Sequence, residues 1–363
     1  MPAAAIAGRE SSLDEAIAAA AALLRASRCA VVAGLGTDVA GAEAAIELAR
    51  LVGGAFDHMH GAAMLADLDV MREGGWLVTS GSLARAFADV LVFVGPGLGA
   101  AWAYLLGGDG PEAPPPLNPD RPRQVIRLCP GREGASAVPA GQTIASRPAD
   151  LPVVLAALRA RVAGRPVGGL KRLDQQLAGL AGTLRGAQYG VAVWSAAALD
   201  PLAIEMLCGL VDDLNATTRF AGLPWAAADN AAGVAQAAAW RTGFPLRVGF
   251  GRGAPEHDPW RFDAARMVEA GEADAAVWIA ACSPAAPPWR RPVPTVALVA
   301  EGTRFAAPPA VAITVGRPGV DHDAMLFDPR LGVIAARYAA DATRKPHVAA
   351  VIGRICEAIG GRC

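Results

Sequence analysis

Two histidines separated by one residue, His58 and His60, form the sequence feature closest to a metal-binding motif. An H-x-H pair binds metal in amidohydrolase barrels, but such a site also needs histidines and an aspartate after later strands. Only three histidines follow, at 257, 322 and 347, and the chain lacks eight strand–helix repeats. We therefore expect a turn with polar side chains at 58–60. His257 and His322 lie in acidic loops, where we expect solvated imidazoles.

Two glycine-rich turns follow apolar runs, GLGT at 34–37 and GPGLGA at 95–100. The dinucleotide-binding fingerprint G-x-G-x-x-G needs a third glycine for close packing of helix and strand. In the first turn that position is Val39, and the second turn also misses the pattern. Either turn could approach a phosphate through its backbone, so a pterin- or nucleotide-binding protein stays an alternative. No P-loop and no G-x-S-x-G elbow occurs, so nucleotide hydrolysis and common serine-hydrolase chemistry are unsupported.

Cysteine spacing and overall charge exclude further classes. The six cysteines are scattered with no CxxC pair, whereas zinc and iron–sulfur sites need clustered thiolates. The formal net charge of -1 gives no general attraction to nucleic acid, so we expect no nucleic-acid partner. The apolar run 17–24 is too short to cross a bilayer, and Asp14 and Glu15 before it are typical of a helix start. We expect a cytoplasmic protein without a membrane segment.

Short apolar runs alternate with helical patterns, which predicts parallel α/β units. The expected strands are 29–34, 88–95, 124–128, 189–195, 275–282, 295–299 and 310–316, and the expected helices are 39–51, 151–162, 171–184, 201–214 and 345–359. The pattern predicts an α/β fold of two doubly wound, mostly parallel-sheet domains, 1–165 and 166–305. The C-terminal segment 306–363 ends in a helix and could return to the first domain.

Three segments resemble, in order, the catalytic B subunit of formylmethanofuran dehydrogenase, a molybdenum or tungsten bis-pterin enzyme. They are AIELARLVGGAFDHMHG (45–61), WRTGFPLRVGFGRGAPEHDPWRF (240–262) with its continuation into GEADAAVWIAACSP, and VAITVGRPGVDHDAMLFDP (311–329). The resemblance spans about 29–329, and its most specific parts are WRTGFPLRVGFGRG and the preceding NAAGVAQAAAW. It implies a fold like the molybdopterin oxidoreductase core.

The departures from that family concern its metal sites. The redox family has a cysteine cluster near its N-terminus for a [4Fe–4S] centre, but no cysteine precedes Cys29 here. The family's metal-binding Cys-His-Gly segment corresponds to Met59-His60-Gly61, and a neutral thioether is a far weaker donor than a thiolate. The resemblance thus implies a vestigial metal position at Met59, His60 and Gly61, with Met59 filling the vacated space. We expect no catalytic residue, metal or cofactor in this chain.

The same pattern is similar to the B subunits of bacterial formyltransferase/hydrolase complexes, which serve formaldehyde oxidation in methylotrophs. In that family a formyl group moves from formyl-tetrahydromethanopterin to a methanofuran analogue and is released as formate. The resemblance implies that the chemistry belongs to the partners: an amidohydrolase-like A subunit that holds the metal, a C subunit, and a D subunit that is the formyltransferase. This chain would be a non-catalytic structural subunit. The alternative is an independent α/β oxidoreductase or transferase. If it used molybdenum or tungsten, it would need a thiolate, serine or aspartate as a ligand of that metal. Asp57 is the nearest oxygen donor, but it lies on the wrong side of Met59-His60-Gly61.

Four arginines lie in or beside the segment most like the parent enzyme: Arg241, Arg247, Arg252 and Arg261. The resemblance implies a carrier with a polyglutamate tail, and guanidinium groups pair bidentately with carboxylates. We hypothesise that some of these arginines bind that tail. The alternative is that they are ordinary solubilising residues, since the chain has only two lysines.

Overall fold

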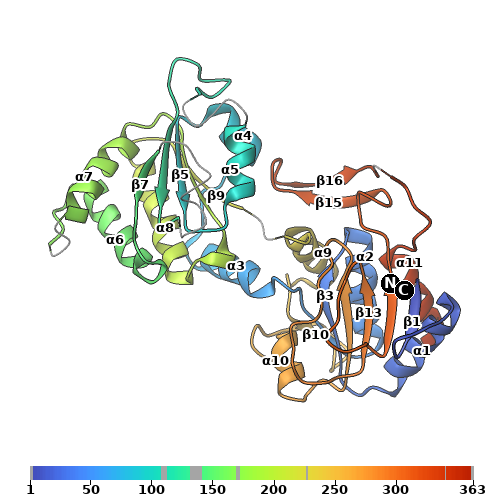
Figure 1. The fold of residues 1–363 in the computed structure, drawn as a ribbon. Coiled ribbons are helices and arrows are strands. Elements are labelled where there is room, and N and C mark those ends of the chain that lie inside the picture. The colour runs from blue at the N-terminus through green and yellow to red at the C-terminus, as the bar shows by residue number, and fades with distance from the viewer. Residues whose placement is uncertain are drawn as a thin grey trace. The chain divides into compact units, whose positions relative to one another are not determined.

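The computed structural model describes residues 3–107, 113–130, 141–168, 172–225, 228–339 and 341–360, which form two compact units (Figure 1). Unit 1 comprises the described residues of Met1–Gly61, Ala228–Phe327 and Ile334–Cys363, and unit 2 those of Ala62–Ala227 and Asp328–Val333. These units differ from the expected divisions at 165/166 and 305/306. The reason is that unit 1 takes its strands from both ends of the chain, whereas reading in sequence order groups chain neighbours.

Within the described residues, unit 1 is built on a nine-stranded sheet with the order β11-β10-β4-β3-β12-β13-β14-β1-β2. Its centre is parallel and buried, as expected for apolar strands that are covered on both faces. Short antiparallel strands extend it at both edges. The parallel strands are β3 (Ala30–Gly36), β4 (Ala55–Phe56), β12 (Ala275–Ala280), β13 (Thr295–Val299) and β14 (Val311–Thr314); the others are β1 (Ala4–Ile6), β2 (Arg9–Glu10), β10 (Val248–Gly249) and β11 (Glu256–His257).

The helices of unit 1 come from three separate parts of the chain. Helix α2 packs on β3, β4, α9 and α11, and α11 packs on α1. Helix α1 begins with a capping box in which the Ser12 hydroxyl accepts from the Glu15 N–H and the Glu15 carboxylate accepts from the Ser12 N–H. These helices are α1 (Leu13–Ala26), α2 (Val39–Leu51), α9 (Ala231–Thr242), α10 (Ala264–Glu269) and α11 (Val348–Ile359).

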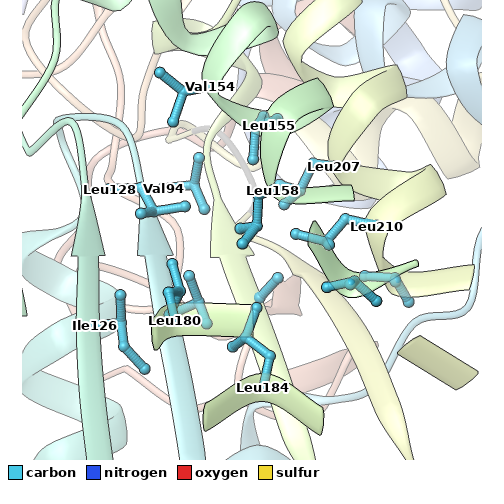
Figure 2. Close-up of a cluster of buried hydrophobic side chains, with 14 of the residues drawn as sticks. Val94, Ile126, Leu128, Val154, Leu155, Leu158, Leu180, Leu184, Leu207 and Leu210 are labelled. Atoms are coloured by element: carbon cyan, nitrogen blue, oxygen red, sulfur yellow. The ribbon is translucent and has the colours of Figure 1, made fainter. Parts of the chain in front are cut away.

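Unit 2 is a three-layer structure around a parallel five-stranded sheet, in the order β7-β6-β5-β8-β9. Alternate residues of β5 point to opposite faces of the sheet. Val90, Val92 and Val94 pack with α6, α7 and α8, and Figure 2 shows Val94 among the leucines of these helices. Leu91 and Phe93 pack with α4 and α5. The strands are β5 (Val90–Val94), β6 (Gln124–Leu128), β7 (Gln142–Ile144), β8 (Gly190–Trp194) and β9 (Phe220–Pro224); the helices are α3 (Gly61–Gly74), α4 (Gly81–Phe87), α5 (Gly99–Leu106), α6 (Leu151–Val162), α7 (Arg172–Arg185) and α8 (Pro201–Asn215).

The expected fold class, two doubly wound α/β sheets, is confirmed. The expected central strands and the helices at 39–51, 151–162 and 201–214 are present with small shifts of their ends. The short edge strands and the hairpin of β15 (Ala324–Asp328) and β16 (Val333–Arg337) were not predicted, because strands this short or half-exposed carry little hydrophobic pattern. None of the helices in the described part of the chain is long and apolar enough to cross a membrane.

Arg123 is a buried cation of unit 2, with only 6% of its surface exposed. Its guanidinium donates to the carbonyls of Arg85 (2.9 Å) and Ala88 (3.2 Å) at the end of α4, and of Leu105 (3.1 Å) at the end of α5. Carbonyls at helix ends lack partners within the helix and carry partial negative charge. The C-termini of two helices thus compensate this buried cation, although burial lowers its pKa.

We predict that Arg123→Met destabilises unit 2 by about 2–4 kcal/mol, because it leaves buried carbonyls without a donor. Hydrogen–deuterium exchange of peptides from β5 and β8 measures this loss separately from unit 1. The control is Arg121→Met, since the Arg121 side chain is 46% exposed and makes only long contacts. Equal exchange in both variants would contradict the view that the buried Arg123 stabilises unit 2.

Candidate functional site

The turn at 57–61 follows β4 and is held along β3. The N–H groups of Asp57 and Met59 donate to the carbonyls of Val32 (3.1 Å) and Gly34 (2.9 Å). Met59 lies against Gly36: a Cβ built on that glycine would lie 2.9 Å from Met59 Cε. Met59 also packs against the apolar cluster of β3, β12 and α10. Its side chain therefore occupies space that the missing Cβ of Gly36 leaves open.

His58, one residue earlier, is buried and neutral. Its Nδ1 accepts from the His60 N–H (3.0 Å), so Nε2 carries the proton and donates to the Asp229 carbonyl (3.1 Å). Burial lowers the pKa of His58 to about 4. Both ring nitrogens are thus used to fix the turn, and neither is available as a ligand.

Asp229, just before α9, is the centre of the polar cluster around this turn. Its carboxylate accepts from His60 Nε2 (3.0 Å) and from the Ser283 hydroxyl (2.5 Å). The hydrogen bond from His60 is the main reason that the pKa of Asp229 is lowered. Asp229 and Asn230 both have left-handed backbone, with φ of 57° and 60°, which non-glycine residues adopt rarely and at a cost. Sequence reasoning missed Asp229 and Ser283, because no spacing rule links them to 58–60.

Asn230 links two further segments to this cluster, the loop after β3 and strand β15. Its side-chain amide donates to the Thr37 carbonyl (2.8 Å) after β3, and its oxygen accepts from the Phe327 N–H (2.8 Å) in β15. The signal that could have revealed these residues was the specific segment NAAGVAQAAAW, which begins at Asn230.

The residues at this turn do not fit a molybdenum or tungsten ligand set. Met59 offers a neutral thioether, and the imidazoles of His58 and His60 are held by hydrogen bonds. Cys282 is close, but burial, with further effects of Asp229 and Asp38, raises its pKa to about 12 and so disfavours a thiolate. No group of three or more potential His, Cys, Asp or Glu ligands occurs among the residues that the structure describes.

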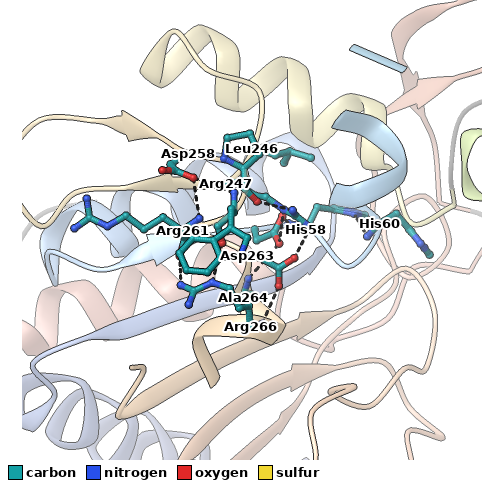
Figure 3. A network of polar contacts seen from close by, with 12 residues as sticks. His58, His60, Leu246, Arg247, Asp258, Arg261, Asp263, Ala264 and Arg266 are labelled. Carbon is teal, nitrogen blue, oxygen red and sulfur yellow. Dashed lines mark hydrogen bonds and ion pairs between the residues drawn. The ribbon is translucent and has the colours of Figure 1, made fainter. Parts of the chain in front are cut away.

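Arg247 fixes the same turn from the other side (Figure 3). Its Nε donates to Asp57 Oδ2 (3.2 Å), its Nη2 pairs with Asp263 (2.6 Å), and its Nη1 donates to the Pro259 carbonyl (2.6 Å). Asp57 also accepts from the N–H groups of His58 (2.8 Å) and Ala264 (3.3 Å). The Arg247 side chain is 13% exposed, so its donors serve the interior of unit 1.

The remaining predicted arginines lie on the surface. Arg252 and Arg261 flank Glu256, at 3.2 Å and 3.5 Å from its carboxylate, and their side chains are 75% and 52% exposed. Arg241 is exposed at the end of α9 and acts electrostatically on Glu47. The structure therefore brings Arg252 and Arg261 together around one carboxylate.

The two expectations of solvated histidines were wrong. His257 lies in β11, where its Nδ1 is 2.8 Å from the Leu246 carbonyl and its ring stacks on Phe244. His322 is 8% exposed and stacks on His347 with ring centroids 3.9 Å apart. The acidic neighbours of both histidines in sequence gave no sign of these ring contacts, which the folded chain brings together.

The glycine-rich turns have packing roles. A Cβ on Gly34 would lie 2.5 Å from the Ile279 carbonyl, so glycine allows the close approach of β3 and β12. Gly95 and Gly97 have positive φ in the turn between β5 and α5. That turn belongs to unit 2, whereas Met59 belongs to unit 1.

Comparison with known proteins identifies the family. The B subunit of the formyltransferase/hydrolase complex Fhc from Methylorubrum extorquens is 38% identical over 343 residues, covering 93% of this chain and 92% of that protein. The chain belongs to the family of Fhc B subunits. A crystal structure of the FhcABCD complex from M. extorquens with methylofuran contains a chain that matches with a TM-score of 0.85 and 37% identity, covering 97% of both chains.

The resemblance to the redox enzyme is weaker. The B subunit of the tungsten-containing formylmethanofuran dehydrogenase 2 from Methanocaldococcus jannaschii is 38% identical over 71 residues, covering 20% of this chain and 16% of that protein. No family model matches the chain. The expected resemblance to Fhc B subunits and to the redox enzyme is confirmed.

The burial of His58 predicts a loss of stability in acid. The folded pKa of about 4 lies below the ordinary histidine value of 6.5, so stability is full above pH 6.5, falls as the pH drops from 6.5 to about 4, and levels off below that pH. The loss should reach about 3 kcal/mol, and His58→Gln should remove most of it while retaining an Nε2 donor. Denaturant titrations at pH 7.5 and pH 4.5 measure the difference. The same acid loss in both proteins would contradict a buried neutral His58.

Proposed function

We propose that this chain is a non-catalytic structural subunit of a formyltransferase/hydrolase complex. The complex moves formyl from formyl-tetrahydromethanopterin to a methanofuran analogue, and releases formate. The observation that supports a non-catalytic role is the packing of Met59, which by the family resemblance corresponds to the metal-binding cysteine of the redox enzyme. The Met59 methyl group packs on Gly36, and both imidazoles beside it are bonded within the fold.

The relative with known structure is part of a complex named FhcABCD and was crystallised with methylofuran. We infer that this chain has the corresponding partners: an amidohydrolase-like A subunit, a C subunit and a D subunit that is the formyltransferase. The metal would then belong to the hydrolase partner, and the carrier would bind to the complex as a whole.

Met59 provides the test of this role. We predict that Met59→Leu leaves formyl transfer and hydrolysis by the assembled complex within about twofold of wild type, because Leu replaces the thioether at similar volume. The assay measures formate release by complexes with equal subunit content. A large loss of activity in a fully assembled, equally stable Met59→Leu complex would mean that the thioether takes part in the chemistry.

We further propose that arginines of unit 1 bind the polyglutamate tail of the carrier. Of the four arginines, the exposed pair Arg252 and Arg261 is best suited, because a carrier carboxylate can replace or join Glu256 between them. Arg241 can add to the attraction from the end of α9. Arg247 would act by holding the turn and α10 in place, since its donors are already bonded.

We predict that the double variant Arg252→Glu/Arg261→Glu weakens carrier binding by the complex about tenfold, with a smaller effect at high salt. The matched control is Arg9→Glu/Arg304→Glu, which changes the same charge at two exposed arginines of unit 1. Calorimetric titration at two salt concentrations gives the affinities. Unchanged affinity, or an equal loss in the control, would refute the tail-binding role.

A further inference from the structure

Helix α4 of unit 2 has an unusual distribution of side chains. Its small residues Gly81 and Ala84 are buried, whereas Leu83 and Phe87 are 49% and 38% exposed. A surface helix normally turns its large apolar residues inward. Leu83 and Phe87 are four residues apart and so share one face of the helix. Within the described residues, no packing contact accounts for this outward apolar face.

The apolar surface continues onto the neighbouring loop and borders a groove. The Leu117 N–H donates to the Ala86 carbonyl (2.9 Å), which places this 63%-exposed leucine beside α4. The groove has a volume of about 350 Å³ and is called the α4 groove below. Its lining residues are Leu83, Phe87, Asn118, Gln188, Tyr189 and Arg219.

The charge of the α4 groove is positive. Arg219 is exposed, lies over the Tyr189 ring at 5.2 Å, and makes no ion pair within the described residues. Arg121, near this groove, donates to the Gly186 carbonyl (3.4 Å) and lies 3.9 Å from the Asp89 carboxylate, so its charge is already paired. The Asp89 carboxylate is 3% exposed and accepts from the N–H groups of Gln188 and Tyr189 (2.9 Å each). Within the described part of the chain, the unpaired positive charge of the groove is therefore that of Arg219.

We propose that the α4 groove is a docking site for a segment of another member of the complex. That segment would place apolar side chains against Leu83, Phe87 and Leu117, and a carboxylate against Arg219. Aromatic residues and arginines surrounded by apolar side chains often dominate the binding energy of protein interfaces. The groove combines such residues in Leu83, Phe87 and the Arg219–Tyr189 pair. This inference rests on the proposed function, because it assigns the groove to a partner within the same complex.

The test uses the full chain and a purified subcomplex of the A, C and D subunits. The variant Leu83→Ser/Phe87→Ser should weaken binding to the subcomplex about tenfold or more, because the truncated side chains are already exposed and mainly lose the partner. Arg219→Glu should also weaken binding, more at low than at high salt, and Arg219→Lys should weaken it less. The control is Val153→Ser/Leu202→Ser, which truncates two residues of unit 2 that are 60% and 49% exposed. Biolayer interferometry gives the affinities.

A photo-crosslinking amino acid at position 117 identifies the occupant in the assembled complex. We expect a crosslink to one of the partner proteins, at a peptide that contains an acidic residue beside apolar ones. A crosslink to a second copy of this chain, no protein crosslink, or equal losses in the groove and control variants would overturn the inference. If wild-type chain does not join the subcomplex, the proposed function fails as well. If it joins and the groove variants bind equally well, only the docking site is wrong.

Discussion

The site in unit 1 depends on the hydrogen bonds that the carboxylate of Asp229 accepts. Asp229 receives His60 from the turn after β4 and Ser283 from the loop after β12, and its own carbonyl receives His58. Because its backbone is held in the left-handed region, these bonds must offset the conformational cost. On the other side of the turn, Arg247 forms ion pairs with Asp57 and Asp263. The conformation of 57–61 is therefore determined by residues from several distant segments.

These hydrogen bonds hold the turn at 57–61 without any contribution from the side chain at position 59. In a turn fixed by hydrogen bonds, the side chain at position 59 is free to become an apolar packing residue. Met59 is suited to that role, because a flexible thioether fills irregular space next to Gly36. This packing role agrees with our proposal that the chain is a structural subunit of the complex.

The sequence predicted the centre of both sheets well, because β3, β5, β8, β12 and β13 are continuous apolar runs. It did not predict which strands share a sheet: β3 pairs with β12, which follows it by roughly 245 residues, and no local pattern records that pairing. The family resemblance singled out Met59, His60 and Gly61, whose role as a vestigial metal position stays a prediction. Asp229 and Ser283 were missed because they act through tertiary contacts. Arg123 shows the same limit, since its buried role depends on two helix ends that only the folded chain brings together.

Our central proposal is that this chain contributes structure to a formyltransferase/hydrolase complex while the chemistry belongs to its partners. The most direct measurement is affinity purification of the full chain from its native host, with mass spectrometry of the bound proteins and elemental analysis of the separated chain. We predict that the formyltransferase and hydrolase partners co-purify, and that the separated chain holds no stoichiometric molybdenum or tungsten. Either metal at one atom per chain, or purification without those partners, would contradict this proposal.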